Sequence, residues 1–202
     1  RELAIPVVGG NVSLYNQSEG GPIPPTPTML VLGGDAMAEP PGAAVEGGGD
    51  LAVIGGRGGG LGGSLYADVM GGGGSFPALP DAPKDQLEAI AEIARSGHIS
   101  AMHDISDGGV VVALLELLGS GGGAQVELPD QEALFTEAPG RVLVETADAS
   151  ALQAQLGGRV EMSLIGYTTT DRQVTITAGG ERVALDGPEQ DAVRQRLADQ
   201  LG

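Results

Sequence analysis

Short apolar runs alternate with helical patterns from residue 51 onward, and glycine stands at most of the junctions between them. Leu87 and Ile90 fall on one helical face, Pro83 suits a first turn and Gly97 ends the pattern, so a helix is expected over 83–96. By the same criteria we expect strands at 51–54, 99–105, 124–128, 141–145, 160–166 and 173–177, and helices at 110–118, 149–156 and 188–200. The 36 glycines are too many for a helix bundle and show no collagen-like period. The pattern indicates a fold that contains both helices and strands (α/β in the broad sense). We expect an α+β arrangement, in which the helices pack on a mixed sheet.

The first 50 residues have a different character. Apolar runs at 4–8 and 28–32 are expected to be strands that close one domain, and the Ala-, Pro- and Gly-rich stretch 35–49 is expected to be a linker. The chain starts abruptly on the first of these runs. We interpret it as a piece of a longer protein that begins inside a domain.

Charge and composition exclude several kinds of partner. The formal net charge is −17, with 10 basic residues against 27 acidic ones, so binding to nucleic acid or to an anionic membrane is not expected. No apolar run reaches the roughly 18 residues of a membrane span, the N-terminus lacks the regions of a signal peptide, and there is no cysteine. A soluble, cytoplasmic protein is expected. A small anionic ligand is still compatible with this charge if backbone N–H groups and a divalent cation hold it.

The first motif with chemical content is Gly-Gly-Asn-Val-Ser-Leu-Tyr-Asn at residues 9–16, directly after an apolar run. Glycine lets a ligand approach the backbone closely, Asn11 offers a neutral oxygen to a metal ion, and Ser13 offers a hydroxyl for hydrogen bonding. The alternative is an ordinary turn, because turns favour these residue types.

The second motif is His-Asp-Ile-Ser-Asp-Gly-Gly at residues 103–109, between an expected strand and an expected helix. Asp104 would lie at the strand's C-terminal end, and Ser106 or Asp107 would cap the helix. The two glycines would leave the first N–H groups of the helix open to a phosphate, and a carboxylate there can hold Mg²⁺. The alternative is a plain N-cap beside a histidine that faces the core.

Other segments carry weaker signals. The glycine-rich run 55–64 invites comparison with a phosphate-binding loop, but it lacks the Lys-Ser/Thr ending, and a mobile loop that leads into a helix at Ser64 is the simpler interpretation. Residues 135–141 indicate a helix end that turns into a strand, with Glu137 and Arg141 paired. His98 is interpreted as a favourable cation near a helix end.

Residues 6–16 and 23–28 closely resemble the signature of phosphoribosylformylglycinamidine synthase, subunit II type. Residues 103–109 with the Val-Val-Val-Ala-Leu-Leu-Glu that follows resemble the second signature of this family, and residues 61–64 and 135–141 are similar to weaker ones. All four agree with the family in order and spacing. The resemblance therefore covers nearly the whole chain.

The resemblance implies an architecture of two pseudo-symmetric halves, each with an A and a B domain. Residues 1–36 would be the end of the second A domain, like the N-terminal domain of aminoimidazole ribonucleotide synthetase, and residues 37–202 the second B domain, like its C-terminal domain. The implied reaction converts formylglycinamide ribonucleotide, ATP and ammonia from glutamine to formylglycinamidine ribonucleotide, ADP and phosphate, with Mg²⁺ neutralising the phosphates. The implied partners are these small molecules, the N-terminal half of the same enzyme, a glutaminase and small accessory subunits.

The resemblance also implies roles for individual residues. Gly10 is similar to an ATP contact, Asn11 to a Mg²⁺ ligand and Ser13 to a substrate contact. Asp104 and Ser106 resemble residues that hold Mg²⁺ and the phosphates of an auxiliary nucleotide in larger family members. The family's catalytic histidine belongs to the first half, so no catalytic residue is expected here and neither His98 nor His103 takes that role.

Three hypotheses follow. The leading one is a piece of this ligase that is inactive alone. The second is a structural half of the enzyme that at most binds an auxiliary nucleotide. The third is a related ATP-dependent synthetase or kinase, such as aminoimidazole ribonucleotide synthetase, selenophosphate synthetase or thiamine-phosphate kinase, against which the complete Gly-Asn-Val-Ser-Leu-Tyr-Asn run argues.

Overall fold

The structure is a computed structural model that describes residues 3–12, 16–23, 26–34 and 40–201, with side chains as far as residue 196. It divides into two units, residues 1–38 and residues 39–202. Among the described residues, no helix is long and apolar enough to cross a membrane.

Among its described residues, the first unit contains one short antiparallel hairpin, made of β1 (Gln17–Ser18) and β2 (Gly21–Pro22). The strands expected at 4–8 and 28–32 are wrong for this structure, since both stretches have irregular backbone. Their apolar side chains are exposed, with Val8 and Leu30 each at 96%. A strand needs a neighbour for its N–H and C=O groups, and an apolar pattern alone does not supply one.

The second unit is built on a seven-stranded sheet in the order β4-β6-β3-β7-β5-β8-β9. The strands are β3 (Asp50–Ile54), β4 (Ile99–Asp104), β5 (Gly123–Leu128), β6 (Val142–Thr146), β7 (Met162–Thr169), β8 (Val174–Ala178) and β9 (Glu181–Leu185). β5 and β8 run parallel, and the other neighbouring pairs run antiparallel. The expected mixed sheet is confirmed. The edge strand β9 was not expected.

In the described part of the second unit, six helices accompany this sheet. They are α1 (Leu65–Met70), α2 (Pro83–Ala94), α3 (Gly109–Leu118), α4 (Gln131–Phe135), α5 (Ala149–Leu156) and α6 (Gly187–Leu201). The four helices expected from periodicity are present, with ends within two residues of the predicted ones. The helix expected to start at Ser64 is α1, for which Ser64 is the N-cap.

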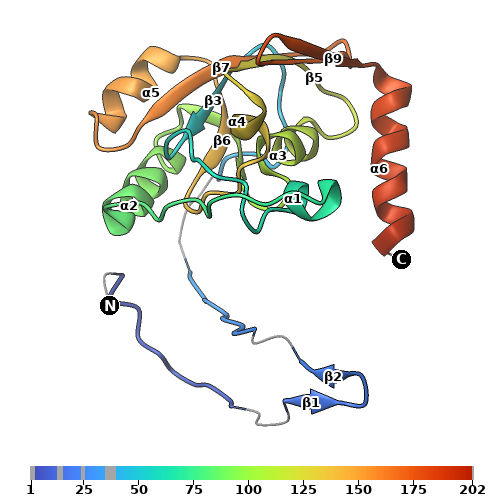
Figure 1. Ribbon diagram of the computed structural model, residues 1–202. Helices are drawn as coiled ribbons and strands as arrows, with labels where there is room; N and C mark the ends of the chain where they lie inside the picture. Colours follow the sequence, from blue (N-terminus) through green and yellow to red (C-terminus); the bar gives the residue numbers. More distant parts are fainter. Residues whose placement is uncertain (1–2, 13–15, 24–25, 35–39, 202) are drawn as a thin grey trace. The chain divides into compact units, whose positions relative to one another are not determined.

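Helices cover both faces of the sheet (Figure 1). Successive strand residues point to opposite faces. Accordingly, Leu51 and Val53 of β3 belong to the core cluster shared with α3 and α4, whereas Ala52 and Ile54 belong to the cluster shared with α2 and α5. The strand is buried on both sides, which explains its uninterrupted apolar sequence.

The segment that leads into β3 is fastened by the carboxylate of Glu145, which is 1% exposed. This carboxylate accepts hydrogen bonds from the amides of Glu46 (2.9 Å) and Gly47 (3.1 Å), from the Ser100 hydroxyl (2.7 Å) and from the Thr168 hydroxyl. Burial raises the pKa of Glu145, but the four hydrogen bonds together outweigh burial and hold the pKa below its ordinary value. The later part of the expected linker is therefore tied to the sheet.

Candidate functional site

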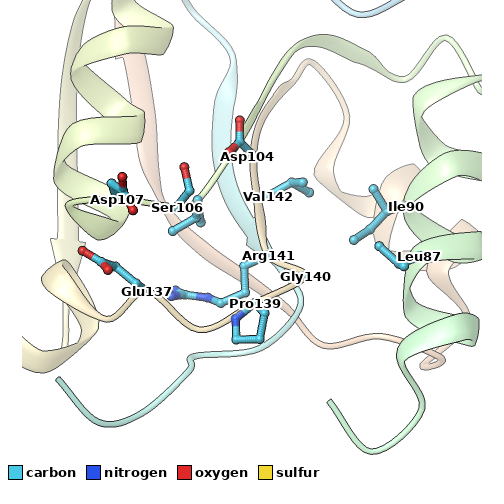
Figure 2. A pocket seen from close by; sticks show the side chains of 11 residues that line it. Leu87, Ile90, Asp104, Ser106, Asp107, Glu137, Pro139, Gly140, Arg141 and Val142 are labelled. Carbon is cyan, nitrogen blue, oxygen red and sulfur yellow. The ribbon is translucent and has the colours of Figure 1, made fainter. Parts of the chain in front are cut away.

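The junction between β4 and α3 borders an open cavity of about 430 Å³. Asp104 ends β4 with 71% of its side chain exposed, and Ser106 and Asp107 follow it along the same wall. Leu87 and Ile90 of α2 form the opposite, apolar wall (Figure 2). The structure thus brings Asp104 and Ser106 together at the C-terminal end of a strand, beside space for a ligand.

The first turn of α3 is capped from a distant part of the chain. Its N-cap residue is Gly108, with φ 81°, and no side chain of the cap itself bonds to the helix. Instead, the Gly108 amide donates to Oε1 of Glu137 at 2.7 Å, and the Gly109 amide donates to the carbonyl of Ser106 at 3.0 Å. The expectation that Ser106 or Asp107 would cap this helix, with both glycine amides open, is wrong. A partner 29 residues away supplies the acceptor.

Glu137 also reaches the start of a second helix. Its Oε1 accepts the amide of Leu65, the first residue of α1, at 2.8 Å. Ser64, Leu65, Asp107 and Glu137 are among the residues around a second cavity, of about 490 Å³. Asp107 and Glu137 line both cavities and therefore stand between them.

Arg141 is 3% exposed. Its guanidinium bonds to the glycine-rich loop and does not pair with Glu137. Its Nε donates to the carbonyl of Gly56 at 3.0 Å and one terminal nitrogen donates to the carbonyl of Thr136 at 3.1 Å, so the expected pairing with Glu137 is wrong. Burial lowers the pKa of Arg141 to about 10, and the charge of Glu161 opposes this shift. The guanidinium stays charged at neutral pH.

The loop 55–63 has further attachments to α4, to Thr136 directly after it and to Ser75 in the stretch after α1. The Gly60 amide donates to Glu132 at 3.0 Å, the Thr136 hydroxyl donates to the Gly60 carbonyl at 3.0 Å, and the Gly62 amide donates to the Ser75 carbonyl at 2.9 Å. These bonds use loop amides that a phosphate-binding loop would direct at its ligand. The geometry favours a structural role for this loop.

The histidines make local contacts. Nδ1 of half-buried His103 lies 2.7 Å from the carbonyl oxygen of Asp104, and Nε2 lies 3.4 Å from the Glu116 carboxylate. His98 is exposed just after α2. Within the described parts of the chain, no group of three or more His, Cys, Asp or Glu side chains is arranged to hold a metal ion. Mg²⁺ commonly keeps several waters and needs only one or two carboxylates beside phosphate oxygens, so Asp104 fits that more modest role.

The motif at residues 9–16 lies in the first unit. Gly10 and Asn11 are exposed, and a side chain at Gly10 would meet nothing within 4 Å. Ser13, expected to contact a substrate, lies outside the described residues. The roles expected for Gly10, Asn11, Asp104 and Ser106 stay predictions.

Residues 47–179 match the family model described as AIR synthase related protein, C-terminal domain. The chain belongs to this family. The β4–α3 junction falls within the residues that match the AIR synthase related family.

Two curated proteins are similar to nearly the whole chain. Phosphoribosylformylglycinamidine synthase subunit PurL of Halobacterium salinarum is 47% identical over 186 residues, which is 92% of this chain and 26% of that protein. The PurL subunit of Natronomonas pharaonis is 44% identical over 204 residues, covering 98% of this chain and 28% of that protein. The chain spans about a quarter of the length of these relatives.

Solved structures agree on the fold of this AIR synthase related chain. Thermotoga maritima PurL complexed with FGAR aligns with a TM-score of 0.61 at 20% identity, over 74% of this chain and 29% of that one. Phosphoribosylformylglycinamidine synthase II from the same organism aligns with a TM-score of 0.59 at 19% identity, over 74% and 27% of the two chains. At this identity the likeness concerns the fold alone.

Proposed function

We propose that this chain is the C-terminal part of a phosphoribosylformylglycinamidine synthase subunit. In the intact enzyme it would take part in converting formylglycinamide ribonucleotide, ATP and glutamine-derived ammonia to formylglycinamidine ribonucleotide, ADP and phosphate. The observation that carries this proposal is 47% identity to a PurL subunit across 92% of the chain. Because the chain spans only a quarter of that relative, it is not expected to catalyse the reaction alone.

Small-molecule substrates fit this proposal. Thermotoga maritima PurL has been solved complexed with ATP and complexed with FGAR, and a PurLQS structure from the same organism supports the presence of further subunits. A glutaminase and small accessory subunits are the proposed partners, together with the N-terminal half of the enzyme, and the proposed location is the cytoplasm.

The active-site contribution is assigned to residues 9–16. In this proposal Gly10 contacts ATP, Asn11 ligates Mg²⁺ and Ser13 contacts the ribonucleotide substrate. Mg²⁺ would neutralise the phosphates during phosphoryl transfer to the amide oxygen. The exposure of Gly10 and Asn11 is compatible with contacts to other parts of the intact enzyme.

Substitution of Asn11 in the intact protein tests this assignment. Asn11→Ala should lower the rate of ADP formation by roughly 100-fold or more while the melting temperature stays within about 1 °C. The control is Gln153→Ala, which removes another exposed amide on α5 and should leave the rate unchanged. A variant that melts earlier yet keeps its rate would favour a structural role for this loop.

A second candidate function concerns the β4–α3 junction. Asp104 and Ser106 line the 430 Å³ cavity, which supports an auxiliary site for Mg²⁺ and nucleotide phosphates. Calorimetric titration with Mg-ADP tests it: saturable heat that Asp104→Ala abolishes would support the site. Absence of heat at millimolar Mg-ADP would count against an open site in the wild-type chain.

A further inference from the structure

Glu137 separates the two cavities at the β4–α3 junction. The cavity of about 430 Å³ includes Asp104 and Ser106 in its wall, and the cavity of about 490 Å³ includes Ser64 and Leu65. Glu137 is half-buried and borders both. In Figure 2 its carboxylate is next to Asp107, away from the apolar wall.

One oxygen of this carboxylate receives two backbone donors from elements far apart in sequence. Oε1 lies 2.8 Å from the Leu65 amide nitrogen and 2.7 Å from the Gly108 amide nitrogen. Converging backbone N–H groups at the start of a helix such as α3 are the donors that phosphate oxygens use. Here the chain's own carboxylate already holds them.

The charge of the side chains around this cavity also opposes the binding of phosphate. Three carboxylates line the cavity of about 430 Å³, those of Asp104, Asp107 and Glu137. The guanidinium of Arg141 is the cation at that wall, and it is engaged with two carbonyl groups. An entering phosphate would therefore meet a net negative wall and would find two of its natural donors occupied.

We infer that Glu137 is an internal anion that closes the β4–α3 junction to phosphate groups by occupying the amides of Leu65 and Gly108. This inference deepens the second candidate function and rests on its placement of phosphate at this junction. In this inference Glu137 inhibits phosphate binding through its hydrogen bonds alone, without forming a covalent bond or binding a metal ion.

Thermal unfolding in inorganic phosphate, at constant ionic strength set with NaCl, tests the inference on the 202-residue chain. Glu137→Ala frees both amides and removes one charge. Phosphate should then raise the melting temperature of this variant by roughly 2–4 °C once it exceeds its Kd about fivefold. The wild-type chain should not respond.

The matched control is Glu132→Ala. Glu132 also accepts a backbone amide, that of Gly60 at 3.0 Å, but it borders neither cavity, so phosphate should not stabilise its variant. If Glu137→Ala does not fold, Glu137→Gln decides. Its neutral amide oxygen accepts the two N–H groups more weakly than a carboxylate does, so phosphate should displace it and stabilise this variant at higher concentration.

Mg-ADP calorimetry separates failure of this inference from failure of the auxiliary site. Binding that appears in Glu137→Ala and is lost when Asp104→Ala is added supports both. Equal binding by the wild type and Glu137→Ala overturns the inference and leaves the auxiliary site standing. If neither Glu137 variant responds to phosphate or Mg-ADP, the inference and the auxiliary site both fall.

Discussion

The carboxylate oxygen Oε1 of Glu137 lies 2.7 Å from the amide nitrogen of Gly108, where α3 begins. This contact replaces the local cap that most helices take from a neighbouring Ser, Thr, Asp or Asn. It also joins the segment after α4 to the end of β4, so the shape of the candidate site depends on a long-range contact. The stability of that junction can be tested separately from function.

Gly108→Ala should destabilise the chain by about 2–4 kcal/mol. Gly108 has φ 81°, and an added Cβ would lie 2.2 Å from a methyl carbon of Val112, so backbone strain and a clash both contribute. Gly97→Ala is the matched control, because Gly97 has φ 75° with open space around it and should cost only about 1 kcal/mol. Urea unfolding of both variants checks the difference, and equal losses would contradict the predicted clash.

Glu145→Gln should destabilise the chain by about 2–3 kcal/mol near neutral pH, because the buried carboxylate accepts four hydrogen bonds. The pKa of Glu145 is lowered in the folded state, so its ionisation contributes stability above the unfolded pKa, about 4.3, and loses it as the pH falls through the folded pKa. The difference in melting temperature from the wild type should therefore shrink below about pH 4.3. A difference that stays constant from pH 6 to pH 3 would rule out this linkage.

Arg141→Lys should lower the free energy of unfolding by about 1–3 kcal/mol. An ammonium group cannot reproduce the guanidinium fork, which donates to the carbonyls of Gly56 and Thr136 at the same time. Hydrogen exchange should also become faster at loop residues 55–63. Arg182→Lys, at an exposed position on β9, serves as the control and should change neither measurement. Unchanged exchange in the Arg141 variant would show that the loop holds its shape without this residue.

Ser64→Ala should cost about 1 kcal/mol by removing the N-cap of α1. The Ser64 hydroxyl accepts the Ala67 amide at 3.1 Å and donates to the Leu61 carbonyl at 2.7 Å. Chemical denaturation measures this loss, and Ser64→Thr, which keeps a hydroxyl cap, should recover part of it. Equal stability of Ser64→Ala and the wild type would mean that Glu137 alone holds the start of α1.

Local sequence patterns were sufficient to predict most helices and strands of the second unit. Helix α2 follows from Pro83, from Leu87 and Ile90 on one face and from Gly97 after the last turn, all within 15 residues. The apolar run of β3 likewise predicted a buried strand. Patterns failed at 4–8 and 28–32, because a strand exists only when another strand pairs with it, and at β9, whose exposed edge position leaves little apolar signal.

The sequence by itself determined the family, through its motifs, and most helices and strands of the second unit, through periodicity and turn residues that act over a few positions. Only the tertiary structure decided which groups meet at the β4–α3 junction. Glu137 caps Gly108 across 29 residues and Leu65 across 72, and Arg141 reaches Gly56 across 85. These contacts exist because the sheet order places β6 between β4 and β3, and no local spacing in a chain specifies which of its strands will be neighbours.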